Sequence, residues 1–266
     1  MTYLDIVLIA VIQALAGVLP LSASGHFALF TGLAGDPMAF AAVSVAAHLG
    51  MGLGLALWLW RDVWAMAVGI GRMVKGKSDP GGRLFLALLA ASLPAGLLGF
   101  WILSELTLPH GQLLAAACLL GFGVLLALAD RWGVTVRRIE HQGMLGAVLF
   151  GLLQLLALVP GVSRTGIVVT AARLVGYERR DAARLALLLG VPALLGLGAF
   201  KLWQLSSQTV LIFSGDLLLA TLLAAFMAWL AAGLMLSWLG RHTFQPFYVW
   251  RIMLGAGVVA LNFLSA

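Results

Sequence analysis

Two short polar groups interrupt long apolar stretches of this chain, and their side chains suit the binding of a phosphate. The first covers residues 22–26 (SASGH) and the second covers residues 160–166 (PGVSRTG). Arg164 carries a planar fork of N–H donors that matches phosphate oxygens, and His26 can act as a nucleophile or proton donor near neutral pH. Glycine allows the backbone to approach a ligand closely. The two groups together predict one site for phosphate or diphosphate.

We expect the catalytic side chains to be His26, Ser24 and Arg164. His26 would attack phosphorus or donate a proton, Arg164 would stabilise negative charge, and Ser24 would assist through its hydroxyl. The candidate substrate-binding residues are small or polar, and they are Ser22, Gly25, Gly161, Ser163, Thr165, Gly166, Gln13 and His48. Three alternatives stay open: a topological charge at Arg164, helix-capping roles for the serines, and core packing for His48.

The composition places these groups inside a membrane protein. Hydrophobic residues make up 62% of the 266-residue chain, charged residues make up only 10%, and the mean hydropathy is +1.07. Six segments approach the ~20 apolar residues that cross a bilayer, and they are residues 40–60, 84–103, 113–129, 182–203, 217–239 and 247–264. The formal charge of +6 does not indicate nucleic-acid binding, because the basic residues are spread over short loops. The sequence predicts an all-α polytopic membrane protein.

Three shorter features refine this prediction. Cys118 is the single cysteine, so the chain can form no intramolecular disulfide and offers no cysteine cluster for a metal. No basic region precedes the apolar residues 6–19, and we expect this stretch to belong to the mature fold rather than to a signal peptide. Residues 63–70 have the pattern of an amphipathic helix at the membrane interface.

Two apolar segments, residues 3–33 and 144–175, are broken by the polar groups and are too short on either side of the break to span comfortably. The basic residues concentrate in four loops, at 61–83, 130–142, 176–181 and 240–245. All four loops lie in the cytoplasm, as the positive-inside rule requires, if each broken segment enters and leaves on one side. We therefore expect two re-entrant helix–loop–helix hairpins and both termini on the periplasmic side.

The two broken segments also resemble each other. Residues 13–25 align with residues 154–166, so that serine meets serine and glycine meets glycine at the breaks. Each half would then hold one hairpin and three spans, and an odd number of spans inverts the second half in the membrane. We expect an inverted-topology repeat with a first half of about residues 1–129, a cytoplasmic linker at 130–143, and a second half of about residues 144–266.

The same motifs carry a resemblance to a known family. Residues 19–26 (LPLSASGH) and 160–166 resemble the two signature regions of the bacterial undecaprenyl-diphosphate phosphatases of bacitracin-resistance type. Further matches follow in order at residues 47–50 (AHLG), 60–62 (WRD) and 246–251 (PFYVWR). The resemblance implies six spans, two re-entrant hairpins, a site where the hairpins meet, and removal of a phosphate from the C55 lipid carrier of cell-wall synthesis. It also implies the bacterial inner membrane.

The chain departs from this family at three positions. Gly17 stands where the family has a second glutamate, Ala23 where it has a serine, and Val168 where it has a threonine. The acidic residues of the chain map to loops or span ends, so we expect no side chain to hold a metal ion. Mg²⁺ or Ca²⁺ would enter only through the phosphates of the substrate.

The resemblance implies one function, and the departures from the family leave a second one open. The first is an integral-membrane phosphatase that converts undecaprenyl diphosphate, a polyprenyl diphosphate, to the monophosphate. The alternative is a catalytically impaired relative that binds or translocates a lipid phosphate, which the substitutions at Gly17 and Ala23 favour. Both functions require a polyprenyl phosphate lipid and the membrane as partners, and neither requires nucleic acid.

Overall fold

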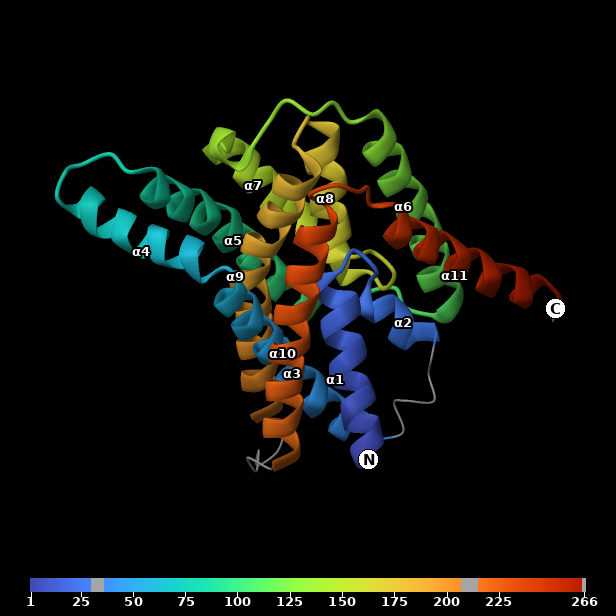
Figure 1. The fold of residues 1–266 in the computed structure, drawn as a ribbon. Helices are drawn as coiled ribbons and strands as arrows, with labels where there is room; N and C mark the ends of the chain where they lie inside the picture. The colour runs from blue at the N-terminus through green and yellow to red at the C-terminus, as the bar shows by residue number, and fades with distance from the viewer. Residues whose placement is uncertain (30–35, 207–214, 265–266) are drawn as a thin grey trace.

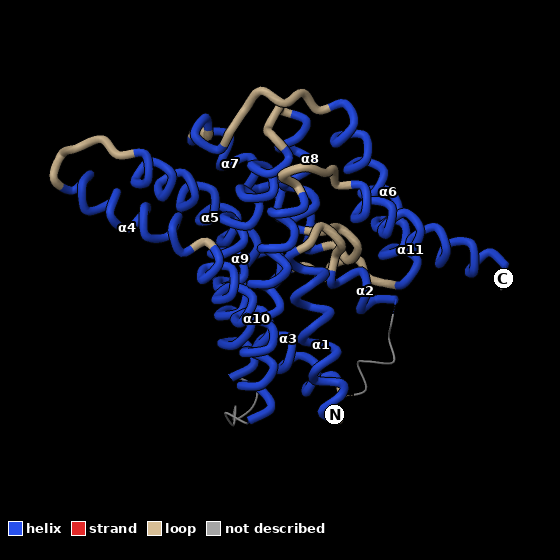
Figure 2. The backbone as a smooth tube through the Cα atoms, in the orientation of Figure 1, coloured by secondary structure: helices blue, strands red, loops and turns tan. Residues whose placement is uncertain are grey.

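The computed structural model describes residues 1–29, 36–206 and 215–264, and within these ranges the chain is helical with a single isolated β-bridge between Arg137 and Tyr177 (Figures 1 and 2). Six helices are long and apolar enough to cross a membrane. They are α3 (Pro37–Trp58), α5 (Pro80–Glu105), α6 (Gln112–Trp132), α9 (Arg179–Ser206), α10 (Gly215–Trp238) and α11 (Gln245–Leu264). The predicted all-α membrane fold with six spans is confirmed, and each helix overlaps the segment predicted for it.

The amphipathic stretch that follows the first span is also a helix, α4 (Trp60–Val74), which begins two residues after α3 ends. It packs against α5, and the two helices project together from the central bundle (Figure 1). Asp79 accepts hydrogen bonds from Gly81 N and Gly82 N at the start of α5, and Arg72 of α4 donates to its other carboxylate oxygen. The Arg72 hydrogen bond lowers the pKa of Asp79 from its usual value.

Both polar groups interrupt helices as the sequence predicts. In the first half, α1 (Tyr3–Val18) is separated by residues 19–22 from the short helix α2 (Ala23–Leu29). In the second half, α7 (Met144–Leu153) continues into a 3₁₀ turn, η3 (Gln154–Leu158), before the break and α8 (Arg164–Leu174). A further 3₁₀ turn, η2 (Ile139–His141), precedes α7. The re-entrant course of these segments through a bilayer, and the side on which the termini lie, stay predictions.

The order of elements is the same in the two halves if α4 is set aside as an addition. The series α1, α2, α3, α5, α6 corresponds to α7, α8, α9, α10, α11. In each half, the first helix packs against a spanning helix of the other half. Helix α1 packs against α10, and the corresponding helix α7 packs against α5. Corresponding helices also pair across the halves, with α3 against α9 and α6 against α11 (Figure 1). This arrangement agrees with the expected duplication, while its proposed boundaries stay a prediction.

Small residues bring α3 and α10 close together at the centre of the bundle. A Cβ atom on Gly50 would overlap the carbonyl oxygen of Thr221, and one on Gly54 would overlap that of Ala225. Close backbone approach of this kind is how helices associate tightly in a bilayer, where there is no hydrophobic driving force between them. The bundle of α1, α3, α9 and α10 forms a fixed support for the two breaks.

A buried carboxylate joins four helix ends on the side predicted to be cytoplasmic. Asp130, which is 3% exposed at the end of α6, accepts a hydrogen bond from Phe244 N just before α11 at 3.0 Å. Its other carboxylate oxygen lies 2.6 Å from Arg179 Nε of α9 and 3.7 Å from Arg173 Nε of α8. Arg173 is 1% exposed, so its charge depends on this carboxylate for compensation.

We expect Asp130→Asn to lower the free energy of unfolding by about 3 kcal/mol, because it keeps the side-chain shape but leaves the buried Arg173 without a counter-charge. The control is Glu178→Gln, which removes the carboxylate of the exposed Arg138–Glu178 pair and should cost less than about 1 kcal/mol. Denaturant unfolding in detergent, followed by circular dichroism, measures both values. Equal losses in the two variants would contradict this role for Asp130.

Candidate active site

The first break is held by an unusual backbone conformation at Ser22, whose φ of 75° lies in the left-handed region. Residues other than glycine rarely adopt this region, and such strain concentrates at functional sites. The conformation directs the Ser22 carbonyl at His26, where it accepts hydrogen bonds from the backbone N at 3.2 Å and from the ring Nδ1 at 2.8 Å. The Ser22 hydroxyl also accepts from Gly25 N at 3.3 Å.

These contacts fix the tautomer of His26. Because Nδ1 donates to a carbonyl oxygen, the proton is on Nδ1 and the lone pair is on Nε2. That lone pair accepts a hydrogen bond from Trp250 Nε1 at 2.9 Å, and the two rings are parallel with centroids 6.2 Å apart. His26 is only 8% exposed. The ring is therefore held as a neutral imidazole whose acceptor nitrogen is covered by the indole of Trp250.

Ser24, the third residue of this group, is exposed and its hydroxyl lies 3.4 Å from that of Ser22. This position leaves the Ser24 hydroxyl open to a ligand at the edge of the break. Ser22, in contrast, is 3% exposed and serves the backbone.

The second break begins at Gly161, whose φ of 93° favours glycine and whose Cα hydrogen faces the backbone of α6, where a Cβ would overlap the carbonyl oxygen of Ala115. Ser163 then caps α8 by accepting a hydrogen bond from Gly166 N at 3.1 Å. The capping role considered from the sequence thus applies to Ser163. The other N–H groups of the first turn of α8 have no partner within the helix, which makes the helix start a favourable place for an anion.

Arg164 lies at this helix start and is held by its neighbours through two of its five N–H donors. Nη1 donates to the Ala186 carbonyl of α9 at 3.1 Å, and Nη2 donates to the Thr165 hydroxyl at 3.3 Å. The guanidinium lies over Gly190, where any side chain would collide with it. Among the described residues no carboxylate pairs with Arg164. Three N–H donors and a full positive charge are left for a ligand.

Arg251 was missed as a site residue by the sequence analysis, where it appeared only within a family motif. It lies in α11 with 0% exposure, and it donates to the Gly161 carbonyl at 2.9 Å and to the Pro20 carbonyl at 3.4 Å. One guanidinium thus binds the backbone of both breaks. The sequence contained a signal for Arg251, because it is a charged residue inside the predicted span 247–264. Charged residues inside a span usually mark a functional site, which is the argument applied to Arg164.

The two breaks are in direct contact. A Cβ on Gly25 would lie 3.1 Å from the Cα of Gly161, and the Thr165 hydroxyl donates to the Gly17 carbonyl at 3.1 Å. The loops of both breaks are seen together near the middle of the molecule (Figure 2). The geometry therefore brings the two sequence motifs to one place, with His26 on one side of the contact and Arg164 on the other. Among the described residues no hydrogen bond joins His26 directly to Arg164.

Gln13 and His48 form a separate pair next to the breaks. His48 Nδ1 donates to the Ser44 carbonyl at 2.7 Å, so its Nε2 accepts from Gln13 Nε2 at 3.2 Å. Gln13 is 6% exposed, and His48 is partly buried between helices. Both side chains are satisfied by protein groups, which agrees with the core-packing role considered for His48. Their proposed contact with substrate stays a prediction.

A comparison with known protein families identifies the family of this chain. A model of the family described as bacitracin resistance protein BacA matches residues 6–257, which is nearly the whole chain. The chain belongs to the BacA family. The resemblance drawn from the two motifs is thereby confirmed.

Several relatives of this family match along their full length. A protein named undecaprenyl-diphosphatase 1 from Paramagnetospirillum magneticum is 47% identical over 265 residues, which cover 100% of this chain and 99% of the relative. Another protein of the same name from Rhodospirillum rubrum is 41% identical, with 100% and 97% covered. An undecaprenyl-diphosphatase from Roseobacter denitrificans is 38% identical, with 96% and 97% covered.

The structure explains how this BacA member accommodates Gly17 in place of the family's glutamate. A Cβ on Gly17 would lie 3.1 Å from the sulfur of Met51, which is 1% exposed. The thioether of Met51 thus occupies the space beside position 17. The side chains at the contact of the breaks are hydroxyls, histidine and arginines, and no cluster of three or more His, Cys, Asp or Glu residues lies in the described ranges. These residues do not fit a metal ion held by the protein.

We expect Arg251→Lys to loosen both breaks, because an ammonium group lacks the planar fork that binds the Pro20 and Gly161 carbonyls together. Hydrogen-exchange mass spectrometry should show faster amide exchange in residues 19–26 and 160–166, by about tenfold or more if one charge-assisted hydrogen bond is lost. Arg241→Lys, at an exposed loop arginine before α11, is the matched control and should leave both segments unchanged. Unchanged exchange in Arg251→Lys would show that Arg251 does not hold the breaks together.

Proposed function

We propose that this protein is an integral-membrane phosphatase that hydrolyses undecaprenyl diphosphate to undecaprenyl phosphate and inorganic phosphate, and so recycles the lipid carrier of the cell wall. The observation that carries the proposal is the direct contact of two broken helices. One of them carries His26 with a fixed acceptor nitrogen, and the other carries Arg164, which pairs with no carboxylate in the described chain. Relatives named undecaprenyl-diphosphatase support the substrate. We place the protein in the bacterial inner membrane with both termini periplasmic.

Binding of the diphosphate follows from the charges at the site. The remaining N–H donors of Arg164 and the first N–H groups of α8 form a cationic and donor-rich surface for the phosphate oxygens. Arg251 acts as a positioning residue, because it is buried and its donors are directed at backbone carbonyls. The exposed hydroxyl of Ser24 can add a hydrogen bond at the rim, whereas Thr165 is fully buried and its hydroxyl already donates to the Gly17 carbonyl. The prenyl chain would remain in the bilayer.

The chemical step uses the lone pair on His26 Nε2. In one route Nε2 attacks the terminal phosphorus, the P–O bond to undecaprenyl phosphate breaks, and water later cleaves the N–P bond to release phosphate. In the other route Nε2 takes a proton from a water molecule while that water attacks the terminal phosphorus, the P–O bond to undecaprenyl phosphate breaks, and the proton then passes to one of the two phosphate products. Both routes require Trp250 to release Nε2. The Arg164 charge stabilises the negative charge that develops on the phosphoryl oxygens in either case.

A divalent cation has no protein ligands in this scheme. Mg²⁺ or Ca²⁺ would reach the site only as a complex with the diphosphate, where it would neutralise charge on the leaving group. The alternative function, binding or translocation of a lipid phosphate without hydrolysis, is not favoured by the relatives.

We expect purified protein to release phosphate from undecaprenyl diphosphate or farnesyl diphosphate, in assays with and without added Mg²⁺ or Ca²⁺. His26→Ala should lower turnover by about 100-fold or more, since it removes the nucleophile or base. Arg164→Gln should lower it by a similar factor, because a charge-stabilising donor is lost. Arg180→Gln, which removes an exposed arginine near the start of α9, should leave turnover unchanged. Saturable binding without any release would favour the alternative function.

The Gly17 position gives a second prediction. Gly17→Glu alone should give little gain, because Met51 fills the space that the new side chain needs. Gly17→Glu combined with Met51→Ala and Ala23→Ser should raise kcat by about tenfold or more if a carboxylate can assist His26. Met51→Ala alone is the control and should reduce stability by about 2 kcal/mol or more without raising kcat. No gain in the triple variant, provided it folds, would count against this role for position 17.

A further inference from the structure

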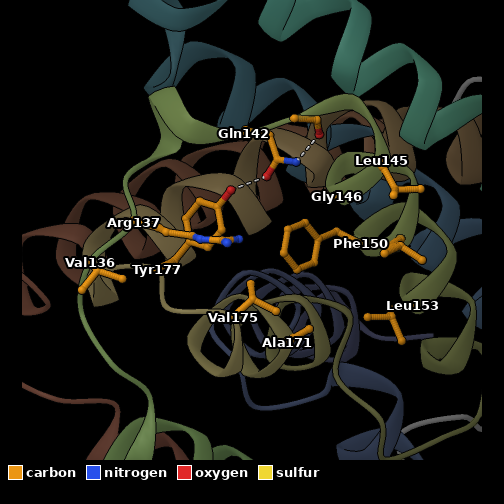
Figure 3. Close-up of a pocket in the computed structure, with 12 residues that line it drawn as sticks. Val136, Arg137, Gln142, Leu145, Gly146, Phe150, Leu153, Ala171, Val175 and Tyr177 are labelled. Atoms are coloured by element: carbon orange, nitrogen blue, oxygen red, sulfur yellow. Dashed lines mark hydrogen bonds between the residues drawn. The ribbon is translucent and has the colours of Figure 1, made fainter.

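A cavity of about 740 Å³ lies away from the site, between α7, α8 and residues 136–143 (Figure 3). None of the proposed catalytic residues lines it. One wall is a stripe of leucines on one face of α7, namely Leu145, Leu149 and Leu153, which recur every four residues. Leu145 is 74% exposed and Leu149 is 53% exposed, so this wall is open to the surroundings. This wall of the cavity is therefore suited to a hydrocarbon chain.

The other end of the cavity is polar and is held in place by backbone hydrogen bonds. Arg137 N donates to the Gly176 carbonyl at 2.8 Å, and Glu178 N donates to the Arg137 carbonyl at 2.9 Å. The Tyr177 hydroxyl donates to Gln142 Oε1 at 2.9 Å, and its ring packs edge-on against Phe150. Burial raises the pKa of Tyr177, so its hydroxyl stays protonated at neutral pH. Arg137 and Gln142 thus form the polar edge of the cavity next to the aromatic rings of Tyr177 and Phe150 (Figure 3).

Two neighbouring arginines in this loop differ in their partners. Arg138 Nε pairs with the Glu178 carboxylate at 2.9 Å. Arg137 lines the cavity, and its side chain pairs with no carboxylate within the described part of the chain. In the close-up its guanidinium end lies beside Tyr177 and faces the side of the cavity where Phe150 lies (Figure 3). A cation that pairs with no carboxylate of the described chain, at the edge of an apolar cavity, is complementary to a ligand with an anionic head and an apolar tail.

The cavity lies where such a ligand is abundant. Gly143 and Leu145, at the start of α7, line it, and so do Arg137 and Gln142 of the loop at residues 130–142, which the positive-inside rule places in the cytoplasm. The cytoplasmic leaflet carries the anionic glycerophospholipids, and basic pockets between helices on that side bind their head groups. We propose that this cavity is a binding site for an anionic glycerophospholipid, with its phosphate at Arg137 and an acyl chain along the leucine stripe of α7.

This proposal does not depend on the proposed phosphatase activity, because the cavity and the contact of the two breaks share no residue. A ligand in this cavity would contact α7, α8 and the loop at 136–143 together. The second break follows α7 in the chain. A bound lipid would therefore stabilise the folded protein, since a ligand that binds only the native state raises stability by mass action.

The test is lipid binding to the purified full chain in detergent, measured by native mass spectrometry with phosphatidylglycerol and phosphatidylcholine of identical acyl chains. Phosphatidylglycerol should bind about tenfold or more tightly than phosphatidylcholine. Arg137→Gln should weaken phosphatidylglycerol binding by about tenfold, which is the effect of losing one charge-assisted hydrogen bond, and so remove most of the difference between the two lipids. Arg131→Gln, at an exposed arginine of α6 outside the cavity, should leave it unchanged. Leu149→Gln should weaken the binding of both lipids.

Three results would overturn the proposal. The first is equal binding of the two lipids by the unaltered protein, which would indicate an apolar surface without recognition of charge. The second is an equal effect of Arg137→Gln and Arg131→Gln, which would indicate a general electrostatic attraction. The third is displacement of phosphatidylglycerol by inorganic phosphate or undecaprenyl phosphate at lower concentration than by the same lipid, which would assign the cavity to a free anion or to the prenyl lipid. His26→Ala should bind phosphatidylglycerol normally, so that loss of turnover and loss of lipid binding are distinguished.

Discussion

The structure depends on how the irregular backbone of the two breaks finds hydrogen-bond partners inside the protein, because buried backbone groups without partners are costly. The side chain of Arg251 supplies hydrogen-bond donors to both breaks. It is fully buried in α11, and its guanidinium binds the Pro20 carbonyl of the first break and the Gly161 carbonyl of the second. The Thr165 hydroxyl binds the Gly17 carbonyl in the same region. The breaks are thus satisfied mainly by each other and by the last helix, which requires the two halves of the chain to be folded together.

The same constraint produces the chemistry. Arg164 and Arg251 bind backbone carbonyls, and neither pairs with a carboxylate among the described residues. A buried cation without an acidic partner is costly, and an incoming diphosphate offsets that cost. His26 lies at the edge of this cationic region, with its tautomer fixed by Ser22 and its free nitrogen covered by Trp250. If the proposed site is correct, these groups are in place before the substrate binds, which is the condition for strong electrostatic stabilisation of a phosphoryl transition state.

Much of this could be predicted from the sequence, because the signals were local. Segment length and hydropathy predicted the six spans, and proline and glycine beside Ser22 and Arg164 predicted the breaks. What the sequence did not give were the partners from distant segments. Trp250 binds His26 across 224 positions of sequence, and Met51 takes the space beside Gly17. Such contacts depend on how α3 and α11 pack against the breaks, and the periodicity of a Leu- and Ala-rich helix does not reveal its packing partner.

The central claim is that a diphosphate binds where the two breaks meet. The most direct measurement is the structure of the protein bound to a methylene-bridged analogue of a prenyl diphosphate, which cannot be hydrolysed. The account predicts that the terminal phosphonate lies within hydrogen-bond distance of Arg164 and beside Nε2 of His26, with the indole of Trp250 withdrawn from that nitrogen. An analogue bound elsewhere, such as at Arg137, with the His26–Trp250 hydrogen bond intact, would contradict it.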